Sequence, residues 1–262
     1  MKSETIRVDD YHFSYTYHKG KKPMTIVPIH GLGGSKDYWQ PIHDYPELAA
    51  YSILIPDLVG FGDSQPAPKG FKYTMKEQAT AVKALIDALA IKGDILLIPH
   101  SMGGPIGIYL AHLLGPRIKG IIYAEGNIDF NDCFGSNLVI TKYTYDEYLK
   151  TGFQKDLEGM GKRGYPPSIV DSQRKAGAVT MYRSSEDLVK VSKEDKLAGE
   201  LKALKVPTLV VYGEKNKGLW TSEKKMADLF PFVFIPGAGH VMMGDNPAAF
   251  YGEVIKFVKG LK

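Results

Sequence analysis

Ser101 is the residue whose surroundings most directly suggest chemistry. It lies in the segment LIPHSMGG (97–104), where an apolar run typical of a strand meets two glycines and then a helical pattern. A serine at a sharp strand-to-helix turn is held out of the sheet, and the motif for this turn is G-x-S-x-G. Here the motif reads P-x-S-x-G, because Pro99 replaces the first glycine. The turn predicts an accessible hydroxyl that could act as a nucleophile.

A serine nucleophile needs partners, because a neutral hydroxyl reacts poorly without a base within hydrogen-bond reach. Several polar side chains could serve, since each follows an apolar run of the strand type directly or by way of a short loop: His30, Glu125, Asn216 and His240. The chemistry therefore depends on whether the chain folds so that these segments end at one place.

Short apolar segments alternate with helical patterns along most of the chain. We expect a hairpin over 5–18 and strands at 24–29, 51–56, 95–98, 118–123, 207–212 and 232–235. We expect helices at 75–91, with Thr74 as the N-cap, and at 222–230 and 247–260. This alternation predicts an α/β fold with a mostly parallel sheet covered by helices on both faces. Ligands bind such sheets beyond the carboxyl ends of the strands, where the polar candidates lie.

The stretch 128–202 interrupts this alternation. It contains no clear buried strand, several helical patterns, many aromatic side chains and the pair Pro166-Pro167. We interpret it as a helical insertion between two core strands. The chain then divides into a first core part at 1–127, the insertion at 128–202 and a second core part at 203–262.

The composition excludes several classes of protein. The 262 residues are 44% hydrophobic and 24% charged, as in a soluble globular protein, and the 33 Lys and Arg residues are scattered rather than gathered into a nucleic-acid-binding face. A single cysteine, Cys133, excludes an internal disulfide and a cysteine-based zinc site. Neither a signal peptide nor a membrane span is visible. We expect a cytoplasmic protein with a small-molecule substrate, no nucleic-acid partner, no metal and no cofactor; its oligomeric state stays open.

Five segments resemble motifs of the α/β-hydrolase family and occur in that family's order. The resemblance covers nearly the whole chain and implies an α/β-hydrolase fold, with the insertion in the place of that family's cap. Asn216 departs from the pattern, because it stands where the family often has an aspartate. The five segments are an oxyanion-type loop (30–35), a D-x-x-G-x-G-x-S loop (57–64), the serine turn (99–104), a P-x-L-x-x-x-G stretch (206–214) and a histidine loop (237–240).

The resemblance implies that His240 is the base, but it leaves the acid open. Glu125 follows the predicted strand at 118–123, and some α/β-hydrolases, haloalkane dehalogenases among them, carry the acid after this strand. An amide at Asn216 cannot supply the negative charge that stabilises an imidazolium. We therefore assign the acid to Glu125.

Three other carboxylates remain alternatives for the acid. Glu214 is the main rival, because it lies two residues before the usual acid position. Asp245 and Asp57 are lesser candidates. Asp57 also has a structural interpretation, in which its side chain ties down the glycine-containing loop 57–64 through backbone hydrogen bonds.

The family's tetrahedral intermediate needs two backbone donors. The resemblance assigns them to the N–H groups of Met102, directly after the nucleophile, and Leu32, in the glycine-rich loop. His30 is expected to hold that loop. Three further side chains are candidates for a substrate pocket, with ordinary packing as the alternative: Trp39, His100 and Trp220.

A serine at the turn implies a route through an acyl-enzyme. We expect a carboxylic-ester hydrolase that acts on a small or medium apolar substrate, with the aromatic insertion covering the site. Hydrolysis of a carbon–carbon, thioester or amide bond stays open, as does a lyase or acyltransferase on the same fold. A ligand-binding protein without catalytic activity is the third alternative.

Overall fold

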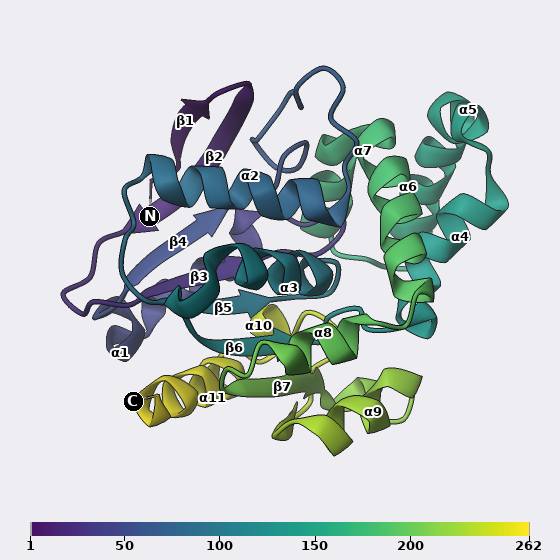
Figure 1. Cartoon of the computed structure of the whole chain (residues 1–262). Helices are drawn as coiled ribbons and strands as arrows, with labels where there is room; N and C mark the ends of the chain where they lie inside the picture. Colours follow the sequence, from purple (N-terminus) through teal and green to yellow (C-terminus); the bar gives the residue numbers. More distant parts are fainter. Residues whose placement is uncertain (1, 262) are drawn as a thin grey trace.

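The computed structural model describes residues 2–261, which form one eight-stranded sheet flanked by helices (Figure 1). The strand order is β1-β2-β4-β3-β5-β6-β7-β8. β2 runs antiparallel to β1 and β4, and all other neighbours are parallel. The predicted mostly parallel sheet is therefore confirmed. The strands are β1 (Glu4–Val8), β2 (Tyr11–His18), β3 (Thr25–Ile29), β4 (Ser52–Pro56), β5 (Ile95–Pro99), β6 (Ile118–Ala124), β7 (Thr208–Gly213) and β8 (Phe232–Ile235).

Alternating side chains on the central strands build a separate core on each face of the sheet. On β5, Ile95 and Leu97 belong to a cluster that includes side chains of α2 (Met75–Ala88) and α3 (Gly103–Leu114). Leu96 and Ile98 belong to a second cluster, which includes side chains of α11 (Pro247–Gly260). Full burial of each such side chain contributes about 1.5–3 kcal/mol. The two-sided burial explains why these strands are apolar throughout instead of alternating with polar residues.

The flanking helices match the sequence-based expectations closely, with one shortened end. α2 begins after Thr74, whose hydroxyl accepts a 3.1 Å hydrogen bond from the Glu77 N–H in a capping box. It ends three residues earlier than expected because Ala90 adopts a left-handed backbone, with φ of +52°. The helices outside 125–207 are α1 (Pro46–Ala49), α2 (Met75–Ala88), α3 (Gly103–Leu114), α9 (Thr221–Leu229), α10 (Met242–Asp245) and α11 (Pro247–Gly260).

Helices also form the chain between β6 and β7, and α4 to α7 gather to one side of the sheet (Figure 1). α7 is kinked at Gly177, where φ is +78°. The first half of α7 reaches the core: Lys175 forms an ion pair with Asp63, and the Gln173 side chain lies on Gly33. The insertion at 128–202 as a separate unit stays a prediction. The helices here are α4 (Phe134–Lys142), α5 (Tyr145–Glu147), α6 (Phe153–Lys162), α7 (Pro167–Lys193) and α8 (Leu197–Ala203).

Within residues 2–261, no helix combines the length and the apolar character that crossing a bilayer requires.

Candidate active site

Ser101 lies in the sharp turn between β5 and α3, with a left-handed backbone (φ +54°) that is unfavourable for a non-glycine residue. Backbone hydrogen bonds hold the turn in place, among them one from the Asn127 N–H to the Ser101 carbonyl at 3.1 Å. The Ser101 N–H donates to the carbonyl of Ala124 at 3.2 Å, and the Ser101 carbonyl accepts from the Gly104 N–H at 2.8 Å. The strained turn therefore packs directly against the end of β6, one residue before Glu125.

Pro99 fits into this turn because Gly107 of α3, eight residues further along the chain, lacks a side chain. A Cβ at Gly107 of α3 would lie 2.7 Å from the Cβ of Pro99. In the G-x-S-x-G motif, the first glycine leaves space in the turn. Here Gly107 of α3 leaves that space instead, and the Pro99 ring occupies it. The departure from G-x-S-x-G at Pro99 is accommodated by packing.

Glu125 and His240 form a short hydrogen bond. His240 Nδ1 donates to Glu125 Oε2 at 2.6 Å, across 115 positions of sequence. The Glu125 side chain is 2% exposed, whereas that of His240, on the loop after β8, is 44% exposed. A buried carboxylate in this position fixes the orientation of the imidazole ring and the tautomer with hydrogen on Nδ1, which leaves Nε2 free to accept a proton.

The Glu125 carboxylate receives further hydrogen bonds from the segment that follows β7. The Gly213 N–H donates to Oε1 at 2.7 Å, and Asn216 Nδ2 lies 3.0 Å from Oε1 and 2.9 Å from Oε2. From the sequence, Asn216 was expected only to lack the charge of the family's usual acid. Its place after β7, where the family often has the acid, indicated that Asn216 lies near the histidine loop. The hydrogen bonds from its amide to Glu125 were not predicted.

The three rival carboxylates bind other groups. Glu214 Oε2 accepts from the Gly237 N–H at 2.8 Å, and Asp245 Oδ2 accepts from the Gly239 N–H at 2.7 Å. Both therefore anchor the loop that carries His240 without bonding its ring. Asp57 accepts from the N–H of Asp63 at 2.8 Å, which agrees with the predicted structural role for this residue.

The loop 30–35 lies directly on the serine. A Cβ at Gly31 would lie 2.8 Å from Ser101 Cβ and 3.2 Å from Ser101 Oγ, so only glycine permits this approach. The N–H groups of Leu32 and Met102 donate no hydrogen bond within the described chain. Two free backbone donors near a serine hydroxyl can stabilise a developing oxyanion.

His30 holds this loop through both ring nitrogens, as the sequence analysis expected. Its Nε2 accepts from the Leu58 N–H at 3.0 Å, so Nδ1 carries the hydrogen and donates to the Gly31 carbonyl at 2.8 Å. Burial lowers the pKa of His30. The neutral ring thus links the loop after β3 to the loop after β4.

The serine and the histidine are brought near one another through His100. The rings of His100 and His240 are 4.6 Å apart, and His100 is adjacent to Ser101 in the chain. Among residues 2–261 the Ser101 hydroxyl takes part in no hydrogen bond, so the structure brings the His240 loop to the serine turn without a hydrogen bond between Ser101 and His240.

The three pocket candidates lie in different surroundings. Trp39 is fully buried and packs on Phe250, with ring centres 6.2 Å apart, which favours its packing interpretation. His100 is 2% exposed. Trp220 is half-buried and lies 5.9 Å from the ring of Phe134 on α4. Trp220 therefore stays a candidate for an apolar wall.

One residue near the site carried no recognisable signal in the sequence. Gln173 of α7 lies on Gly33, next to the proposed donor at Leu32. No motif marks it, because the contact depends on how the inserted helices fold back over the sheet. No group of three or more metal-ligating side chains occurs among residues 2–261.

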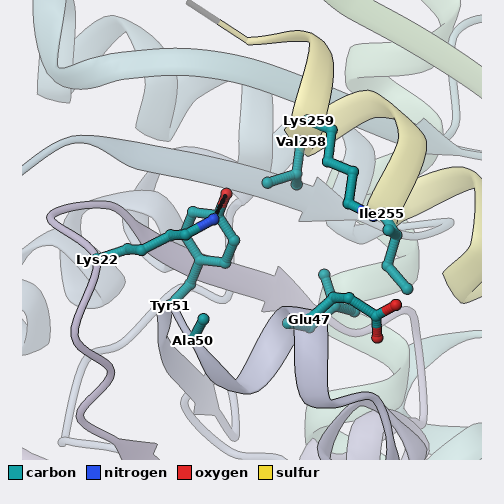
Figure 2. Close-up of a pocket in the computed structure, with 8 residues that line it drawn as sticks. Lys22, Glu47, Ala50, Tyr51, Ile255, Val258 and Lys259 are labelled. Atoms are coloured by element: carbon teal, nitrogen blue, oxygen red, sulfur yellow. Dashed lines mark hydrogen bonds between the residues drawn. The ribbon is translucent and has the colours of Figure 1, made fainter.

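A cavity of about 140 Å³ lies far from these residues, between α1 and α11 (Figure 2). Lys22 precedes β3 and Tyr51 precedes β4, so the cavity is at the amino edge of the sheet, whereas Ser101 follows a carboxyl end. In Figure 2 the Lys22 amine lies over the Tyr51 ring, and its Nζ donates to the Tyr51 hydroxyl at 2.9 Å. This cavity therefore has no part in chemistry at Ser101.

Comparison with known proteins agrees with the fold. A model described as "Alpha/beta hydrolase family" matches residues 26–253, which include Ser101, Glu125 and His240. Lipase 1 of Psychrobacter immobilis is 26% identical over 249 residues, covering 86% of this chain and 76% of the lipase. Lipase 3 of Moraxella sp. (strain TA144) is 28% identical over 249 residues, covering 90% and 78%. The solved structure of a thermophilic esterase from Thermogutta terrifontis shares the fold, with a TM-score of 0.72, 20% identity and coverage of 99% and 98%.

Proposed function

This chain belongs to the alpha/beta hydrolase family, and we propose that it is a serine hydrolase that cleaves carboxylic esters of small or medium apolar substrates. In this proposal Ser101 is the nucleophile, His240 the base and Glu125 the acid. The N–H groups of Leu32 and Met102 stabilise the oxyanion.

The observation that carries the proposal is the 2.6 Å hydrogen bond between His240 Nδ1 and the buried Glu125 carboxylate. A buried carboxylate is costly unless it is paired, and this one is paired with a half-exposed histidine next to a strained serine turn. Such strain is concentrated at functional sites. Packing alone gives no reason for a left-handed serine beside two free backbone donors.

The chemistry follows from these positions. Ser101 Oγ attacks the ester carbonyl carbon while its proton passes to His240 Nε2, and Glu125 stabilises the imidazolium that forms. The oxyanion is bound by the two backbone donors, and its collapse expels the alcohol, which takes the proton from His240. Water then attacks the acyl-enzyme by the same steps and releases the carboxylic acid.

Two features favour ester hydrolysis among the possible acyl transfers. The His240 side chain is 44% exposed, which gives water access to the base in the second half-reaction. The two relatives described above are lipases, and lipases act on esters. In this proposal the paired rings of Phe134 and Trp220, 5.9 Å apart, supply apolar surface for the acyl group.

The direct test is hydrolysis of p-nitrophenyl esters with acyl chains of increasing length. We expect Ser101→Ala to lower kcat by roughly 10⁶-fold, to near background, because removal of a nucleophile of this kind has that effect. Ser168→Ala, which changes an exposed serine of α7, is the matched control and should retain full activity. Turnover by folded Ser101→Ala at the wild-type rate would refute the proposal.

A further inference from the structure

His100 is fully buried, yet it is the residue directly before the proposed nucleophile. Its Nε2 lies 2.8 Å from the backbone carbonyl oxygen of His240, which is 140 positions away in sequence. The contact therefore joins the turn that carries the nucleophile to the loop that carries the base.

The partner of Nε2 determines which nitrogen of His100 carries hydrogen. A carbonyl oxygen only accepts, so Nε2 is the donor and Nδ1 is an unprotonated acceptor. Nδ1 is buried and has no hydrogen-bond partner in the described part of the chain. A Cβ at Gly31 would lie 3.3 Å from it, so the loop 30–35 covers this side of the ring. Burial and the neighbouring His240 hold the pKa of His100 well below its usual value.

Aromatic neighbours fix the ring on its other sides. Trp39 meets His100 edge to face, with ring centres 6.4 Å apart, and the His240 ring lies 4.6 Å away. Trp39 is itself fully buried against Phe250. Because the ring cannot move without disturbing this core, its donor is held at one point relative to Ser101.

The other anchors of the histidine loop are more exposed. Glu214 and Asp245 hold the N–H groups of Gly237 and Gly239 through solvent-exposed hydrogen bonds. Exposed hydrogen bonds constrain a loop weakly, because water competes for both partners. The contact from His100 comes from a buried ring and meets the backbone of the base itself.

Building on the proposed function, we propose that His100 is a positioning residue that fixes the backbone of His240, so that the ring bonded to Glu125 is held beside the turn of Ser101. In this proposal His100 acts through the backbone of His240, whereas the sequence predicted a pocket residue. Misplacement of a reacting group by about 1 Å costs on the order of 100-fold in rate. Loss of the donor should therefore lower kcat and leave KM nearly unchanged.

Two substitutions distinguish the effect of losing the hydrogen-bond donor from the effect of losing the aromatic ring. His100→Phe keeps an aromatic ring but removes the donor. His100→Gln removes the ring, but its amide nitrogen lies the same number of bonds from Cα as Nε2 and still reaches the carbonyl. We expect kcat for a p-nitrophenyl ester to fall about 10- to 100-fold in the phenylalanine variant. The glutamine variant should stay within about threefold of wild type, and KM should change little in either.

The control is His112→Gln, which changes an exposed histidine of α3 and should behave as wild type. Folding is checked by circular dichroism; if His100→Phe does not fold, His100→Asn replaces it, because that amide is one bond too short to reach the carbonyl. The proposal is wrong if the variant without the donor keeps its kcat, or if the glutamine variant is as impaired as the phenylalanine variant. An inactive wild-type protein would instead contradict the proposed function, so the two failures are distinguishable.

Discussion

At the scale of single residues, the Glu125 carboxylate is the best-connected group of the candidate site. It accepts from His240, from the Gly213 N–H and from the Asn216 amide. Hydrogen bonds to a charged group contribute about 1.5–3 kcal/mol each, which offsets the cost of burying the carboxylate. Asn216, which follows β7 at the family's usual acid position, thus donates to Glu125, which follows β6.

Substitution of this acid gives a prediction at the same scale. Glu125→Gln keeps the size of the side chain but removes the charge that stabilises protonated His240. We expect kcat to fall roughly 10⁴-fold, as for loss of the acid in a serine triad. The measurement is steady-state hydrolysis of a short p-nitrophenyl ester.

Glu214→Gln is the matched control, because Glu214 anchors Gly237 without touching the ring of His240. It should lower kcat by less than about tenfold, since it removes one exposed hydrogen bond. If Glu214→Gln instead lowered kcat more than Glu125→Gln, Glu214 would be the acid.

At the scale of elements, an ion-pair network joins the loops that follow β3 and β4. The Lys36 amine, 3% exposed, lies 2.7 Å from Asp57 Oδ2 and 2.8 Å from Asp63 Oδ2. Asp57 is fully buried and also accepts from the Lys36 N–H at 2.7 Å. His30 joins the same two loops, so this network supports the position of the proposed oxyanion donor at Leu32.

Asp57→Ala should therefore destabilise the protein strongly. The change leaves the buried Lys36 amine with Asp63 alone and takes the acceptor from the N–H groups of Lys36 and Asp63. Breaking a buried ion pair costs about 3–5 kcal/mol. Urea unfolding gives the free energy directly. Asp87→Ala breaks the exposed Lys83–Asp87 pair and should cost under about 1 kcal/mol, so equal losses in the two variants would contradict this account.

The sequence specified the elements better than the contacts between them. β3, β4, α9 and α11 lie within one residue of their predicted bounds because apolar runs and helical spacing are local signals. The hydrogen bond from Asn216 to Glu125 and the contact of Gln173 with Gly33 join segments far apart in the chain. No local pattern encodes such contacts, because they arise only when the sheet order and the inserted helices are fixed.

At the scale of the whole molecule, buried histidines make stability depend on pH. Burial lowers the pKa values of His30 and His100 in the folded state, whereas unfolded histidines titrate near 6.5. As pH falls through about 6.5, the unfolded chain binds protons that the folded chain does not, so the free energy of unfolding decreases. Each histidine contributes a slope of up to about 1.4 kcal/mol per pH unit.

Below about pH 6, Asp132 has the opposite effect on the free energy of unfolding. Burial raises its pKa to about 6, so below that pH the folded state takes up a proton that the unfolded state does not. Burial also lowers the pKa of His43 and raises that of Asp187. Three histidines outweigh two carboxyl groups, so we expect a net loss of stability between pH 6.5 and pH 5. Urea unfolding at several pH values measures this slope.

The variant His100→Gln measures how much His100 alone contributes to the pH dependence of the free energy of unfolding. Its free energy of unfolding should fall less steeply with decreasing pH than that of wild type, by up to about 1.4 kcal/mol per pH unit. Identical slopes for the two proteins would show that His100 is not a neutral buried group.

The most direct test of the central claim, that Ser101 is a nucleophile activated by His240, is to find where a fluorophosphonate reacts. The protein is incubated with the probe, digested and examined by mass spectrometry. We predict a single adduct on Ser101, formed at a rate that falls strongly in His240→Ala. An adduct on another residue, or ester hydrolysis that continues in a protein never labelled at Ser101, would contradict the account.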